Sequence, residues 1–156
     1  CASLQRWSPR KHGTYDARAN RQSMMTQLVG LFGACLLVAN ALFQLALAAG
    51  VRWGNAAFGG KVAQDHGSLP TRYRVMSLVS AAIMGFLVMV VLSASSVGNT
   101  RPMDAGFATL VCKGATVLFA LNTAGNLAST NKIERWVMGS ATVCLTISFG
   151  LIGWVF

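Results

Sequence analysis

Polar side chains with the potential for chemistry lie inside the most apolar parts of the sequence. Asn40 and Gln44 are four residues apart, as are Asn122 and Asn126, and this spacing places each pair on one face of a helix. The core of a bilayer offers no water to these amides, so each must bond to protein or to a ligand. We expect both faces to point inward or toward another protein. There they would either hydrogen-bond between helices or line the path of a ligand or solute.

Gln44, Asn122 and Asn126 are also candidate contacts for a bound cofactor, because an amide side chain can coordinate the metal of a pigment. His66, outside the apolar segments, is a fourth candidate. Chlorophyll, carotenoid and lipid are the ligands that such positions would suit. The two histidines, His12 and His66, are isolated from each other and from any acidic cluster, so no metal-ion site is expected.

Lys113 is the charged residue that falls inside an expected membrane span. It lies about nine residues into the segment 105–128, or about 13 Å of helical rise, and projects roughly opposite Asn122. Charges within a span are functional candidates. A lysine this close to the helix start can also extend its stem to the lipid headgroups, and the sequence leaves both interpretations open.

The remaining reactive residues do not form a catalytic set. We find no nucleophile beside a base, no phosphate-binding loop and no paired carboxylates, so we expect that the protein is not an enzyme. The four cysteines include no Cys-x-x-Cys pair, which argues against a disulfide framework and a zinc site. We expect the three within spans to pack as small apolar side chains. The cysteines are Cys1, Cys35, Cys112 and Cys144.

Long segments without Asp, Glu, Lys or Arg identify the elements that would position these residues. Charged residues make up 11% of the chain, against roughly 25% in soluble domains, and about 20 apolar residues suffice to cross a bilayer. The sequence therefore predicts an all-α membrane protein, a bundle of four transmembrane helices in residues 24–156. A basic, irregular tail is expected over residues 1–23. The expected spans are about 24–49, 75–97, 105–128 and 134–156.

Small residues recur at helical spacing and predict where the helices approach one another. Signals at the helix ends are Pro70, Asp104, and Asn131 followed by Glu134 with the spacing of a capping box. Gly30 and Ala34 form one small stripe, in the first span. The other expected packing positions are Ser77, Ala81 and Gly85 in the second span, and Ser140, Cys144 and Ser148 in the fourth.

The net charge of +9 is concentrated at the ends of the expected spans. Such charges favour contact with anionic lipid headgroups and membrane subunits, and we expect no nucleic-acid partner. The two sides of the membrane carry equal numbers of basic residues, which leaves the orientation open. Residues 1–23 are rich in Arg and Ser, as beside an organelle import signal or in a tail at a membrane surface. The start Cys1-Ala2 loosely fits a plastid processing site.

Two stretches resemble a group of uncharacterised small bacterial membrane proteins with four predicted spans. The first comprises Phe43-Gln44-Leu45, Gly50-Val51-Arg52-Trp53-Gly54, Gly59-Gly60 and Leu69-Pro70. The second comprises Asn122, Asn126-Leu127, Ser129 and Glu134-Arg135. The resemblance covers roughly residues 40–75 and 120–140 and implies only the four-span architecture.

Two functions agree with these features. The first is a non-catalytic accessory subunit of a large energy-transducing complex in an organelle inner or thylakoid membrane, slightly favouring a photosystem. In this case the basic tail would dock on neighbouring subunits. The alternative is a small transporter or channel-like protein that uses the amide faces and Lys113.

Overall fold

Four long helices form the protein in the computed structural model, which describes residues 12–57, 62–63, 66–99 and 103–155. They are α1 (His12–Ala48), α2 (Thr71–Ala94), α3 (Ala105–Ala128) and α4 (Gly139–Gly150), and π-helical turns at Glu134–Met138 and Leu151–Val155 extend α4 at both ends. Each span is long and apolar enough to cross a membrane. The predicted all-α bundle of four transmembrane helices is confirmed, and the chain is a multi-pass integral membrane protein.

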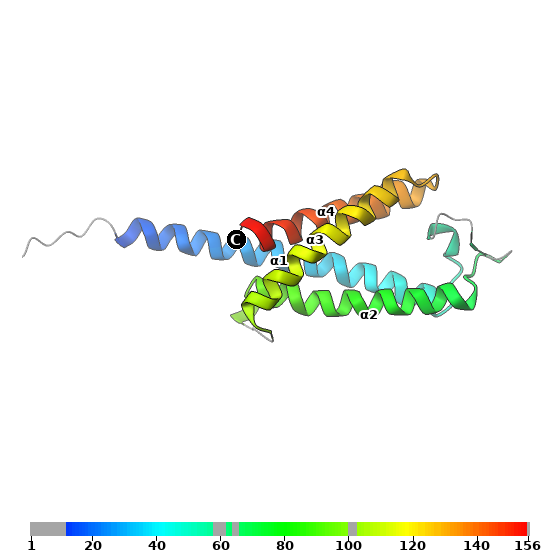
Figure 1. Ribbon diagram of the computed structural model, residues 1–156, viewed down its shortest axis with the longest axis horizontal. Coiled ribbons are helices and arrows are strands. Elements are labelled where there is room, and N and C mark those ends of the chain that lie inside the picture. The colour runs from blue at the N-terminus through cyan, green and yellow to red at the C-terminus, as the bar shows by residue number, and fades with distance from the viewer. Residues whose placement is uncertain (1–11, 58–61, 64–65, 100–102, 156) are drawn as a thin grey trace, which may run out of the picture.

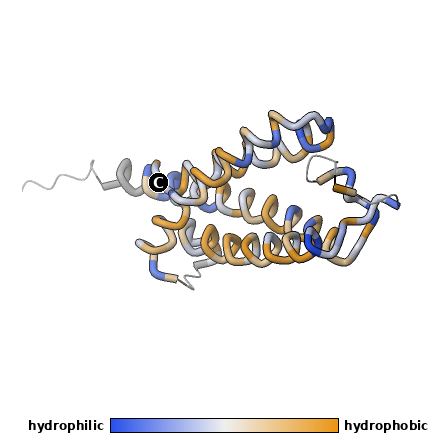
Figure 2. Tube along the Cα trace, turned by 45° about the vertical axis from the view of Figure 1, so that its right-hand side comes forward, coloured by the Kyte–Doolittle hydropathy of each residue, from blue (hydrophilic) through white to orange (hydrophobic). Residues whose placement is uncertain are grey.

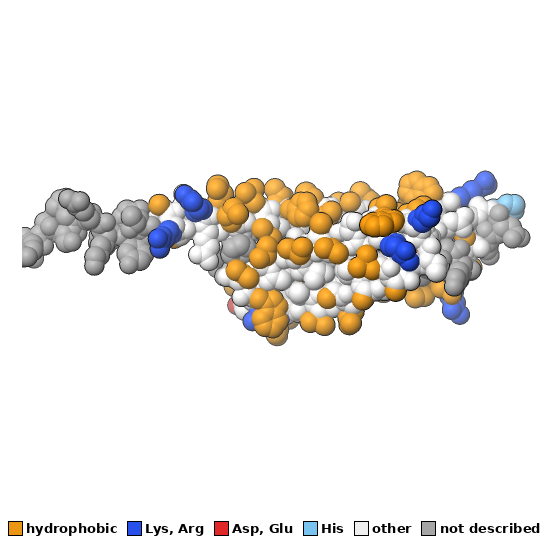
Figure 3. Space-filling model, turned by 90° about the horizontal axis from the view of Figure 1, so that it is seen from above, with side chains coloured by type: hydrophobic (Ala, Val, Ile, Leu, Met, Phe, Trp, Pro, Cys, Tyr) orange, Lys and Arg blue, Asp and Glu red, His pale blue; other side chains and the backbone are white. Residues whose placement is uncertain are grey.

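The helices form two antiparallel hairpins, α1 with α2 and α3 with α4. Figure 1 shows the hairpins packed together toward the end of α4, with the start of α1 projecting beyond this end, and diverging toward the opposite end. We call the diverging end the loop end, because it carries the α1–α2 and α3–α4 connections. Apolar residues cover the length of the helices (Figure 2), and Lys and Arg side chains gather toward the two ends of the long axis (Figure 3).

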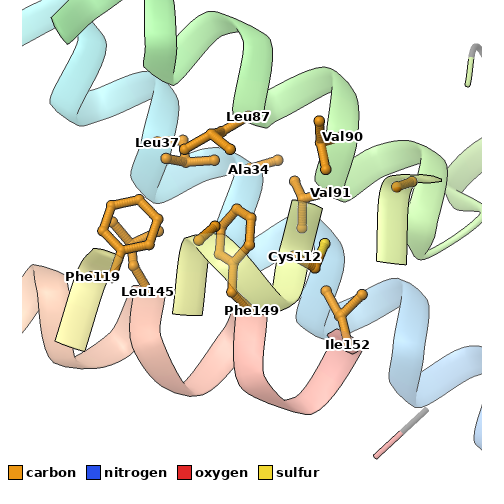
Figure 4. Packing of buried hydrophobic residues seen from close by; sticks show 12 residues of the cluster. Ala34, Leu37, Leu87, Val90, Val91, Cys112, Phe119, Leu145, Phe149 and Ile152 are labelled. Carbon is orange, nitrogen blue, oxygen red and sulfur yellow. The ribbon is translucent and has the colours of Figure 1, made fainter. Parts of the chain in front are cut away.

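A core of interlocking apolar side chains joins the hairpins (Figure 4). Leu37, Val90, Leu145 and Phe149 are fully buried in it, and the ring centroids of Phe119 and Phe149 lie 5.4 Å apart. In a bilayer the surrounding lipid is as apolar as this core. Close van der Waals packing therefore contributes more to helix association than the hydrophobic effect does.

Glycines permit the closest approaches between helices. A Cβ atom at Gly30 would overlap Oγ of Ser95, and one at Gly33 would lie 3.3 Å from Cβ of Ser148. Gly30 and Ala34 are both buried against the other helices. The first span therefore approaches α2 and α4 through small residues.

The other small-residue stripes are only partly placed at helix contacts. Ser77 and Ala81 are buried, whereas Gly85 is exposed and a Cβ there would meet no atom within 4 Å. In α4, Ser148 is buried, Cys144 is half-buried and Ser140 is exposed. The four-residue spacing drifts around a helix with 3.6 residues per turn. Hence Gly85 and Ser140 rotate away from the contacts that Ala81 and Ser148 make.

The first helix begins much earlier than expected. The prediction of irregular chain is wrong for residues 12–23, which continue α1 back to His12. The apolar span supplies a formed helix, and adding residues to an existing helix avoids the cost of nucleation. Residues 1–11 lie outside the described part of the chain. The second span is also shifted, to Thr71–Ala94 instead of 75–97.

Side chains at the helix ends hold the connections in place. Arg74 donates from Nε to the carbonyl of Ala48 at the end of α1, at 2.8 Å. Asp104 is the N-cap of α3 and accepts from the backbone N–H of Phe107 at 2.9 Å. Asn131 accepts from the backbone N–H of Ile133, so it caps the fourth span as its position predicts.

Candidate functional site

A cavity of about 430 Å³ lies between the two hairpins near the loop end. It combines both amide faces that the sequence singled out, since the α1 pair and the α3 pair line it together. Ser80 of α2 and Thr142 of α4 complete the set, so all four helices contribute. Its polar lining residues are Asn40, Gln44, Ser80, Asn122, Asn126, Glu134 and Thr142.

The polar lining reaches into the membrane-spanning part of the helices. Asn122 precedes the end of α3 at Ala128 by about six residues, and Asn40 precedes Ala48 by about eight. These separations place the two amides about 9 and 12 Å below the helix ends. Such depths lie within the hydrocarbon region, where polar groups require partners. The cavity therefore brings polar side chains into the membrane-spanning part of the helices, where Asn122 is exposed and Asn40, Gln44 and Asn126 are half-buried.

Glu134 contributes a carboxyl group to this cavity. Its residue is only 8% exposed, and the hydroxyl of Ser129 donates to Oε2 at 2.5 Å. The same hydroxyl accepts from the backbone N–H of Asn131 at 3.1 Å. The expected capping box is thus modified, because the carboxylate of Glu134 bonds to Ser129, which in turn bonds to the backbone of Asn131.

The sequence predicts Glu134 as a capping residue, whereas the structure also places it in the lining of the cavity. A signal was present, since Glu134, Met138 and Thr142 follow one another at four-residue intervals and all line the cavity. The helix begins with a π-helical turn at Glu134–Met138, a feature that is rare and frequent at functional sites.

Hydrogen bonding within the cavity is incomplete. Asn126 donates from Nδ2 to Oγ1 of Thr142 at 3.4 Å, and Thr142 donates to the carbonyl of Gly139 at 3.0 Å. By contrast, Oε1 of Gln44 is buried and has no hydrogen-bond partner among the described residues. A buried acceptor without a donor is unfavourable, so this oxygen provides a place for a ligand that donates a hydrogen bond.

The α1–α2 connection covers the cavity at the loop end. Its short 3₁₀ turn, Gly54–Ala56, is held by a 2.8 Å bond from the N–H of Gly54 to the carbonyl of Gly67. Ala57 follows the turn, packs near Leu47 and lines the cavity. The side chain of Asn131 donates to the carbonyl of Asn55 and links the α3–α4 connection to this cover.

Two of the predicted functional residues lie away from the cavity. His66 is exposed in the α1–α2 connection and is not part of the lining, so it does not share a site with Gln44, Asn122 and Asn126. Lys113 lies toward the opposite end of the bundle.

The ammonium group of Lys113 sits over the ring of Trp154, 4.8 Å from its centroid. Trp154 is 66% exposed near the end of the fourth span. This cation–π contact agrees with a lysine that reaches toward the headgroup region. A close backbone approach supports it, because a Cβ at Gly153 would lie 3.1 Å from the backbone nitrogen of Lys113.

Among the described residues, no three His, Cys, Asp or Glu side chains lie together. Of the cysteines there, Cys112 is buried, Cys144 half-buried and Cys35 exposed.

The chain matches no protein-family model, no curated protein and no solved structure. Residues from stretches 40–75 and 120–140 meet at the cavity, where the first stretch supplies Gln44 and the second supplies Asn122, Asn126 and Glu134.

Proposed function

We propose that the protein is a small membrane transporter that takes a polar solute into the cavity between its hairpins. The observation that carries the proposal is the convergence of the amides of α1 and α3 on one cavity with a carboxyl group. Substrate sites of many transporters lie within the bilayer between two packed halves that rock against each other. Here the halves are the α1–α2 and α3–α4 hairpins.

The arrangement of contacts suits such a motion. Away from the loop end the two hairpins approach closely, because a Cβ at Gly33 of α1 would lie 3.3 Å from Cβ of Ser148 of α4. At the loop end the hairpins are bridged by the hydrogen bond from Asn131 to Asn55. Breaking this bond would let the hairpins separate there while the opposite end stays packed, which opens the cavity to the aqueous side.

Proteoliposome swelling provides the test. Vesicles containing the full chain are exposed to gradients of glycerol, acetamide or ethanolamine, and light scattering reports solute influx. We expect at least one solute to enter faster than in empty vesicles, and the Asn126→Leu variant to remove most of this gain because it replaces a cavity amide with an apolar side chain. Two results would contradict transport. One is that none of the three solutes enters faster than in empty vesicles. The other is that every solute that enters does so as fast with the Asn126→Leu variant as with the unchanged protein.

A matched pair of variants is Thr142→Val, inside the cavity, and Thr109→Val on α3, outside it. Thr109 is half-buried, does not line the cavity, and bonds to the carbonyl of Ala105 in its own helix. Thr142→Val makes the same chemical change inside the cavity. We therefore expect influx to fall in Thr142→Val and to be unchanged in Thr109→Val.

A second candidate function is an accessory subunit of a larger energy-transducing membrane assembly. The length of α1 favours it, because 37 residues span about 55 Å, well beyond a hydrocarbon core of about 30 Å. Arg18 and Arg21 are exposed on its N-terminal part and could contact acidic neighbours in an organelle membrane, such as a photosystem in the thylakoid. Migration as a small species in native gels after mild solubilisation would exclude this function.

A further inference from the structure

One face of α1 changes from basic to apolar along its length. Arg18 and Arg21 are exposed, and so are Met25, Leu28 and Phe32. Seven residues make about two turns of an α-helix, so residues seven apart lie on the same face. Arg21 is therefore in line with Leu28, and Arg18 with Met25 and Phe32. This face carries positive charge near the start of the helix and apolar side chains nearer its middle.

The apolar part of this face borders a groove of about 300 Å³ between α1 and α4, which we call the α1–α4 groove. Leu28 and Phe32 line it on α1, and Ile147 and Leu151 line it on α4. Leu28, Phe32 and Ile147 are 56%, 52% and 56% exposed. Exposed apolar side chains of a membrane span face the lipid tails, which are equally apolar. The groove is therefore accessible to an acyl chain.

Both arginines lie at the level of the lipid headgroups. Among the described residues, the exposed large apolar side chains of α1 begin at Met24. From Met24 to the helix end at Ala48 the rise is about 36 Å, which crosses a hydrocarbon core of about 30 Å when the helix is tilted. Arg21 and Arg18 precede Met24 by about 5 and 9 Å of helical rise. These distances place them beside the headgroups, outside the hydrocarbon.

The charge of this face indicates the class of lipid. Arginine binds phosphate groups through paired hydrogen bonds. The sequence has no Asp or Glu from Ala17 to Ala48 in α1 and none from Gly139 to Gly150 in α4. The two helices that form the groove therefore supply no carboxylate to balance the arginines. A lipid with net negative charge balances them, whereas a zwitterionic lipid brings a cation of its own.

We infer that this face binds an anionic phospholipid, with its phosphate at Arg18 and Arg21 and one acyl chain in the α1–α4 groove. The site is distinct from the proposed transport cavity, since no residue that lines the groove also lines the cavity. Because α1 and α4 belong to different hairpins, the lipid contacts both of them. It does so at the end of the bundle where Gly33 meets Ser148.

Photolabelling of the full chain in phosphatidylcholine nanodiscs tests this placement. The probe is phosphatidylglycerol with a diazirine in one acyl chain, the control is phosphatidylcholine with the same chain, and mass spectrometry locates the labelled residues. Each basic residue near an anionic lipid contributes about fivefold in affinity. We therefore expect phosphatidylglycerol to label the groove at least fivefold more than phosphatidylcholine does. Excess unlabelled phosphatidylglycerol should remove this difference, and the same concentration of inorganic phosphate should not.

A matched pair of double variants tests the headgroup contacts. Arg18→Gln with Arg21→Gln should reduce the preference for phosphatidylglycerol at the groove at least fivefold. Arg52→Gln with Arg72→Gln removes the same charge from two exposed positions at the loop end and should leave the preference unchanged. Arg18 and Arg21 project beyond the packed bundle, so their replacement should leave labelling by phosphatidylcholine unchanged.

A pair of single variants tests the acyl-chain contacts. Ile147→Trp fills the groove and should reduce its labelling by phosphatidylglycerol at least fivefold. Val137→Trp makes a similar change in the fourth span, at a position that is 59% exposed and outside the groove, and should have no effect.

Three results would overturn the inference. The first is equal labelling of the groove by the two lipids, or labelling by neither. The second is the same preference for phosphatidylglycerol on the outer faces of α2 and α3, which indicates a general attraction to the membrane surface. The third is an equal loss of preference in the two arginine double variants.

Discussion

Replacing Gln44 with leucine should make the protein more stable and less active. Its Oε1 atom is buried without a hydrogen-bond partner in the described residues. A polar atom left in this state costs about 1–3 kcal/mol. Leucine has a similar length and no polar atom, so it removes this cost and adds apolar contact with the neighbouring side chains.

The expected gain is at the lower end of that range. Hydrogen bonds between helices in membranes contribute about 0.6 kcal/mol on average, because the unfolded chain in a bilayer also finds partners. We therefore expect Gln44→Leu to raise the free energy of unfolding by about 1 kcal/mol, close to a fivefold change in the ratio of folded to unfolded protein. Unfolding in mixed micelles with increasing sodium dodecyl sulfate, followed by tryptophan fluorescence, measures this change.

Gln27→Leu is the matched control. Gln27 lies on the same helix and donates from Nε2 to the carbonyl of Ser96 at 3.4 Å, so its replacement removes a bond and should leave stability unchanged or slightly lower. If Gln44→Leu destabilises the protein by more than about 1 kcal/mol, then Oε1 is satisfied in the folded protein, for example by water. In that case the argument that this atom awaits a ligand is wrong.

Two further predictions concern the end of the bundle away from the cavity. Gly30→Ala should destabilise the protein by about 1–3 kcal/mol through overpacking against Ser95. Gly114→Ala should instead stabilise it by about 0.5–1 kcal/mol, because a Cβ atom at Gly114 meets no atom within 4 Å. The same unfolding assay compares the two variants. Lys113→Met should remove the contact with Trp154 and lower stability by about 0.5–1 kcal/mol without changing solute influx, and reduced influx at normal stability would show that the lysine acts in transport.

The sequence was sufficient for the four spans because the bilayer imposes a simple rule. A segment that must hide its backbone polar groups becomes a helix of predictable length, and the third span follows the expected bounds, Ala105–Ala128. The sequence does not reveal the start of α1, because this rule applies only to the part of a helix that lies in the bilayer. Outside the bilayer, hydropathy no longer marks a helix end, so continuation of the helix to His12 leaves no apolar signal.

The candidate site was predictable only in part. Spacing placed Asn122 with Asn126 and Asn40 with Gln44, and burial in lipid required partners for all four. That the two faces meet each other depends on how the hairpins are rotated and splayed, which the helical period does not determine. The drift that moved Gly85 and Ser140 out of the helix contacts illustrates the same limit, since 3.6 residues per turn separates residues that a four-residue count keeps together.

The uneven packing along the bundle connects the fold to the proposed function. Small residues bring the two hairpins into close contact far from the loop end, where Gly33 of α1 meets Ser148 of α4. Polar residues occupy the loop end, where amide and hydroxyl side chains pack less tightly and leave a cavity. Separating tightly packed helices loses van der Waals contacts that water cannot replace. A tightly packed region therefore resists separation more than a hydrated cavity does. Motion of the hairpins should therefore pivot near Gly33 and change the width of the cavity, which places the moving part of the protein at its polar site.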